Sequence, residues 1–60
     1  MWEDGNVESV KTLIEAADST SSKETKRRTL LQAQSSAACI KDEYTRKNLL
    51  KLIEDKLADL

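Results

Sequence analysis

Apolar residues recur along this chain at steps of three and four positions, which is the spacing of one face of an α-helix. The first segment with this pattern predicts a helix over about residues 6–18, with Asn6 as its N-cap. Its apolar side is made by Val7, Val10, Leu13, Ile14 and Ala17. The short polar residues that follow, up to Ser22, predict a loop, because their side chains compete with the helical backbone for hydrogen bonds.

A second helix is predicted over about residues 21–41. It opens with Ser21 and Glu24, which match the S-x-x-E capping box. Its first two turns hold no large apolar residue. The stripe then runs through Leu30, Ala33, Ala37, Ile40 and Tyr44. Residues 35–38 are all small, so another helix could approach closely at this point.

Beyond this stripe the apolar rhythm shifts. At an unchanged step Lys47 and Lys51 would face inward, but the apolar residues fall at other positions. They are Leu49, Leu50, Leu52, Ile53, Leu57 and Leu60. The shift therefore predicts a turn near residues 41–45, followed by a third helix over about residues 43–60.

Asp42 or Thr45 is predicted to cap the third helix. The alternative is one long helix from Ser22 to Leu60 whose apolar stripe drifts around its surface. No glycine or proline follows Gly5, so no helix-breaking residue decides between the two. We favour the break, because a single helix of this length would be atypical of a compact domain.

The chain has 60 residues, of which 38% are hydrophobic and 35% charged. A chain of this size buries only about 60% of the surface that it exposes when unfolded, so its stability is marginal. We expect an all-α fold, a small antiparallel three-helix bundle, or else a helical hairpin that completes its core as a dimer. Residues 1–5 are expected to be a flexible N-terminus and 6–60 a single helical domain, either complete or excised from a larger protein.

Few residues offer reactive chemistry. The chain has no histidine and one cysteine, so neither an internal disulfide nor a zinc-finger pattern can form. Cys39 lies beside the second stripe and is expected to act as a small buried hydrophobe. We therefore predict no catalytic, cofactor-binding or metal-binding residues and no enzymatic activity. The single cysteine fits a reducing, intracellular setting, cytoplasmic or nuclear, and no apolar run approaches the ~20 residues of a membrane span.

Charge is distributed unevenly along the chain. Residues 1–18 have a net charge of −4, residues 19–41 of +4 and residues 42–60 of −1. The basic cluster is formed by Lys23, Lys26, Arg27 and Arg28, with Lys41, Arg46 and Lys47 further along the chain. Nucleic-acid binding through the basic start of the second helix is a weak alternative, because no aromatic residue lies among the bases and the chain as a whole is acidic. A solvated or intramolecularly paired basic face accounts for them more simply.

The third segment has more leucine than one narrow stripe requires, which indicates burial against two neighbours. Those neighbours are the other two helices alone, a helix from another protein, or a second copy in a homodimer. We favour a non-catalytic docking or adaptor module that binds an amphipathic or acidic partner helix in an apolar groove of helices two and three. A homo-oligomerisation domain is the main alternative. The candidate anchors are Leu31, Leu50 and Leu57, and the candidate rim charges are Lys26, Arg27, Lys47 and Lys51.

Overall fold

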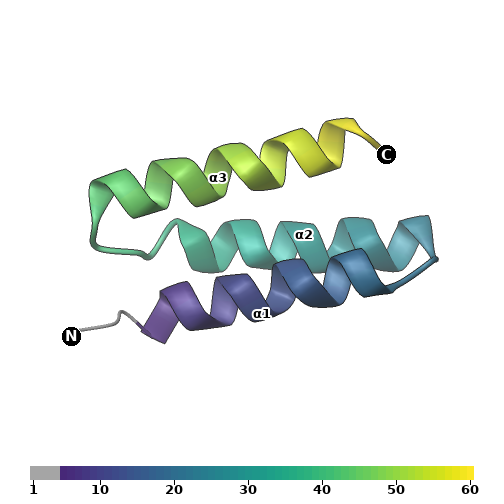
Figure 1. Cartoon of the computed structure of the whole chain (residues 1–60), viewed down its shortest axis with the longest axis horizontal. Helices are drawn as coiled ribbons and strands as arrows, with labels where there is room; N and C mark the ends of the chain where they lie inside the picture. The colour runs from purple at the N-terminus through teal and green to yellow at the C-terminus, as the bar shows by residue number, and fades with distance from the viewer. Residues whose placement is uncertain (1–4) are drawn as a thin grey trace.

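The computed structural model describes residues 5–60, and it forms three helices. They are α1 (Gly5–Ser19), α2 (Lys23–Ala37) and α3 (Glu43–Ala58). Successive helices run in opposite directions, so that α1 and α3 end at the same end of the molecule (Figure 1). The predicted all-α three-helix bundle is confirmed. Of the expected flexible segment, residues 1–4 lie outside the described residues, and Gly5 already begins α1.

Polar side chains cap the second and third helices where the backbone is still extended. Ser22 precedes α2 and accepts a hydrogen bond from the backbone N–H of Thr25 at 3.3 Å. The N-cap is thus Ser22 rather than Ser21, one position later than the capping-box pattern predicts. Asp42 precedes α3 and accepts from the backbone N–H of Thr45 at 2.9 Å, which confirms it as a cap. Each cap satisfies a backbone donor that has no partner within its helix.

The turn between α2 and α3 lies at residues 38–42, earlier than the predicted 41–45. Ala38 keeps right-handed helical torsion angles, with φ −63° and ψ −19°, and its N–H still donates to the carbonyl of Gln34. Within residues 5–60 no residue has a positive φ. The turn therefore needs no glycine, and this explains why the sequence does not mark its position.

The core is a single cluster drawn from all three helices and the turn. Among the described residues every buried one is apolar: Val10, Ile14, Ala17, Leu30, Ala33, Ala37, Ile40 and Ile53. Three of them are alanines with no exposed surface, which lets α1 and α2 pack closely along their length. The apolar stripes predicted for the first two helices thus supply the core. The second stripe does so from Leu30 to Ile40.

The third helix is less completely packed than the other two. It lies mainly on α2 and touches α1 little. Ile53 is its only buried residue among those described, while Leu49, Leu50, Leu57 and Leu60 are half-buried against the core. The apolar face of α3 is therefore wider than the surface that α1 and α2 cover.

Two side chains near the turn differ from expectation. Tyr44 continues the α2 stripe in sequence, but it is 76% exposed. Because α2 ends at Ala37, Tyr44 belongs to α3. It precedes Ile53 by nine residues, a spacing that places the two side chains about 180° apart around the helix. Cys39 is exposed rather than buried, because it lies in the turn after the end of α2.

The start of the first helix also differs from the sequence pattern. Asn6 was the predicted N-cap, but α1 already begins at Gly5, so Asn6 lies within the first turn. Its side-chain amide instead donates a hydrogen bond of 3.4 Å to the carbonyl of Cys39. Asn6 therefore links the start of α1 to the turn between α2 and α3.

Candidate functional site

The three predicted anchors lie on α2 and α3 with different degrees of burial. Leu31 is 46% exposed and lies two positions from Ala33, about 160° away from it around α2. Leu50 and Leu57 are half-buried, and their spacing of seven residues places them on one flank of α3. Leu31 thus belongs to the outer face of α2, and the other two to the edge of the core.

A hollow of about 360 Å³ joins the two helices where α2 begins and α3 ends. It is lined by Lys23, Glu24, Arg27 and Leu60. Arg27 and Leu31 are one turn apart on α2, so Leu31 lies on the same side of α2 as this hollow but does not line it. The lining is charged apart from Leu60. The surface between α2 and α3 is therefore a mixed surface at this end, with bases, one acid and one apolar residue, rather than a purely apolar groove.

The predicted rim charges do not all share one environment. Arg27 and Lys51 are exposed, and the ammonium group of Lys47 lies 3.3 Å from the carboxylate of Glu43, one turn earlier on α3. Lys26 is half-buried and precedes Leu30 by one turn on the inner side of α2. The structure thus places Lys26 apart from the other three.

The bases of the sequence are divided between the two ends of the bundle. Lys23 and Arg28 lie at the start of α2, whereas Lys47 lies near the start of α3 at the opposite end (Figure 1). The molecule is 35 Å long along this axis. Arg28 is 3.9 Å from Glu24, and the guanidinium of Arg46 donates to the carbonyl of Ile40 at 3.0 Å. Several of these cations therefore have partners within the chain.

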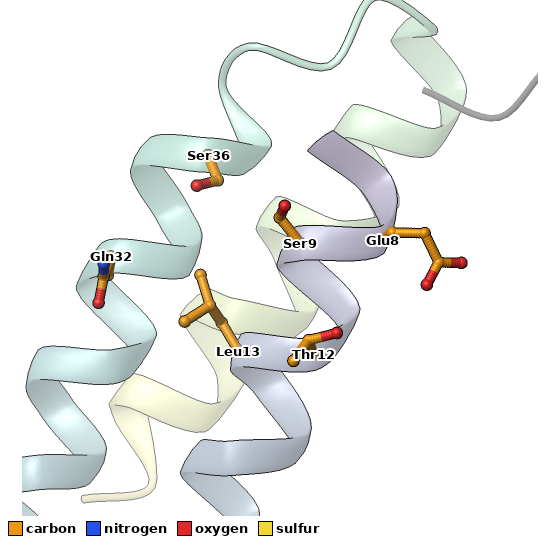
Figure 2. A pocket seen from close by; sticks show the side chains of 6 residues that line it. All are labelled: Glu8, Ser9, Thr12, Leu13, Gln32 and Ser36. Carbon is orange, nitrogen blue, oxygen red and sulfur yellow. The ribbon is translucent and has the colours of Figure 1, made fainter. Parts of the chain in front are cut away.

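A second hollow, which the sequence reasoning missed, lies between α1 and α2. It measures about 450 Å³ and is open to solvent. Figure 2 shows Leu13 reaching into the gap from α1 and Ser36 lining it from α2, while the carboxylate of Glu8 points outward. The remaining lining residues are Ser9, Thr12 and Gln32. The sequence offered one signal for this hollow. Polar residues lie beside the apolar stripe of each helix, Ser9 and Thr12 on α1 and Gln32 and Ser36 on α2.

A third hollow of about 170 Å³ lies where all three helices meet, at the same end as the α1–α2 loop. Asp18, Lys26, Lys56, Asp59 and Leu60 line it. The ammonium group of Lys56 donates to both carboxylate oxygens of Asp18, at 3.0 and 3.1 Å. Two lysines and two aspartates face each other here, so the cluster is balanced in formal charge.

Within residues 5–60, one titratable group has a clearly shifted pKa. The hydroxyl of Thr45 donates to the carboxylate of Asp42 at 2.7 Å, beside the bond from the Thr45 backbone. These hydrogen bonds hold the pKa of Asp42 below its ordinary value of 3.8, against an opposing effect of desolvation and with a weaker contribution from the charge of Arg46. This shift reflects a helix cap and does not indicate a reactive carboxylate.

Within residues 5–60, no three metal-ligating side chains lie close enough to hold an ion together. In the same part of the chain, no helix is both long enough and apolar enough to cross a membrane.

Comparisons with known proteins identify no relationship. No family model, no curated protein and no solved structure matches this chain.

Proposed function

We propose that this chain is a non-catalytic docking module that binds an acidic amphipathic helix on the outer surface between α2 and α3. The observation that carries the proposal is the incomplete burial of apolar side chains on this surface. Leu50 and Leu57 remain half-buried, and Leu31 is 46% exposed on the neighbouring helix. An amphipathic helix placed across them would bury apolar surface, which is the main driving force of such docking.

Charge favours an acidic partner. The bases in this region are Lys23, Arg27, Lys47 and Lys51, one more than its acids, which are Glu24, Glu43 and Glu54. Lys47 already has an acidic neighbour in Glu43, but that pair is exposed and contributes little. The excess of cations would speed the approach of an acidic helix and orient it.

A synthetic amphipathic helix of about 18 residues tests this proposal, with leucines at i, i+3, i+4 and i+7 and glutamates beside them. Its affinity for the full chain is measured by fluorescence anisotropy. Lys51→Glu is expected to weaken binding about three- to tenfold, because it turns an attraction into a repulsion. The matched control is Lys11→Glu on α1, which should leave the affinity unchanged. Equal losses in both variants would show a non-specific charge effect and count against the docking surface.

Homo-oligomerisation is the second candidate, and the same half-buried leucines support it. In that case the surface would be covered by another copy of the chain. Sedimentation equilibrium over a hundredfold range of concentration separates the two proposals. A monomer at every concentration would remove the second, and a stable dimer that excludes the peptide would remove the first.

A further inference from the structure

We propose that α3 is a hinged helix that opens as a unit from the paired α1 and α2, with the Lys56–Asp18 ion pair as its latch. The pivot is the short segment of residues 41–42 between the buried Ile40 and α3. This inference does not rest on the proposed function, because opening is a property of the chain alone.

The helices pack unequally, so that α1 and α2 hold each other more firmly than either holds α3. The helices α1 and α2 lie against each other along their length, whereas α3 lies less extensively on α2 and touches α1 little. In α3 only Ile53 is buried among the described residues. Segments with few buried apolar contacts open at a lower free energy than the whole fold, so α3 is the element that should open first.

The turn that precedes α3 stays fixed when the helix moves. Ile40 is 1% exposed and belongs to the core cluster, and the carbonyl of Cys39 accepts a bond from Asn6 of α1. Asp42, two residues beyond Ile40, is extended, with ψ 116°. A rotation at residues 41–42 therefore moves α3 while Ile40 remains in place, and it breaks the hydrogen bond of 3.0 Å from the Arg46 guanidinium to the Ile40 carbonyl.

The latch lies at the opposite end of α3 from the pivot. Lys56 is near the end of α3 and Asp18 near the end of α1, and their side chains are 28% and 53% exposed. Lys26 and Asp59 line the same hollow, so they face the pair from α2 and from the end of α3. An ion pair of this exposure is weak and is screened by salt, which makes it suited to reversible opening.

Opening uncovers an apolar face that α3 otherwise covers. Leu30, Ile14 and Val10 belong to the core cluster that Ile53 completes.

Native-state hydrogen exchange of the full chain, followed by NMR at low urea concentrations, tests the hinge. We expect amides in the middle of α3 to exchange at least about tenfold faster than buried amides of α1 and α2, with a weaker dependence on urea. The decisive variant is Ala16→Gly, at an exposed position of α1. It should accelerate exchange in α1 and α2 about fivefold and leave α3 unchanged, because α1 remains helical in both the closed and the hinged state.

The latch is tested by Lys56→Ala, with Asp55→Asn on the outer side of α3 as the matched control. Loss of the ion pair should accelerate exchange in α3 about two- to fivefold, whereas the control should stay within about twofold of the unaltered chain. If Ala16→Gly accelerates α3 as much as α1 and α2, the bundle opens only as a whole and the hinge is wrong. If the control accelerates α3 as much as Lys56→Ala, the pair is not a latch.

Discussion

Lys56 and Asp18, 38 residues apart in the sequence, are joined through two hydrogen bonds of 3.0 and 3.1 Å. Of the ion pairs that the structure describes within residues 5–60, this is the one that links two helices. It bridges α1 and α3, whose own packing is slight. A double-mutant cycle of Asp18→Ala and Lys56→Ala should give a coupling free energy of about 0.2–1 kcal/mol that falls as salt is added. Urea denaturation measures it, and a coupling that is independent of salt would contradict the assignment.

Ile53 and Leu52 are neighbours in sequence, but they make opposite contributions to the fold. Ile53 has no exposed surface, whereas Leu52 is 41% exposed. We expect Ile53→Ala to lower the free energy of unfolding by about 2–5 kcal/mol, because it leaves a cavity in the core. Leu52→Ala should lower the free energy of unfolding much less. Chemical denaturation followed by circular dichroism compares the two, and equal losses would mean that α3 packs with a different face.

Asp42 should make the stability of the protein depend on pH in the acidic range. Its pKa is lowered in the folded chain by hydrogen bonds from Thr45, so the carboxylate form favours folding. The stabilisation is fully present above the ordinary pKa of 3.8 and is lost as the pH falls through the folded-state pKa. Asp42→Asn keeps a capping oxygen and does not titrate. The stability difference between the unaltered chain and this variant should therefore shrink below pH 3.8, and a constant difference would contradict the role of the charge.

The sequence predicted the fold class and the inward faces of the first two helices, because the apolar spacing there is regular. Val10, Leu30 and Ala33 all fall on predicted stripes and are buried. The shift of register after Ile40 also indicated correctly that the chain turns before a third helix. These features depend on short-range periodicity, which one sequence displays fully.

The position of the turn could not be predicted, for a physical reason. Ala38 still has ordinary helical torsion angles, and the chain leaves the helix after it without any positive φ within residues 5–60, so no glycine was needed. Tyr44 was consequently counted in the apolar stripe of the second segment although it is exposed, and Cys39 was expected to be buried although it is exposed.

The candidate site was harder to predict than the fold. Lys26 and Arg27 are adjacent in sequence, and about 100° of helix rotation places them in different surroundings. Lys26 is half-buried beside Asp18 and Lys56, whereas Arg27 is exposed between α2 and the end of α3. Such differences in burial depend on how the helices pack, so they cannot be predicted from the composition of residues 23–28.

The most direct test of the central claim is methyl NMR of the full chain during titration with the acidic amphipathic peptide. The account predicts shifts of the methyl signals of Leu31, Leu50 and Leu57, and none with a matched peptide in which lysines replace the glutamates. Leu31→Ser should abolish most of the effect, whereas Leu52→Ser, at a similarly exposed leucine on the other flank of α3, should not. Shifts confined to Leu13 and the surface between α1 and α2, or no shifts at all, would contradict the account.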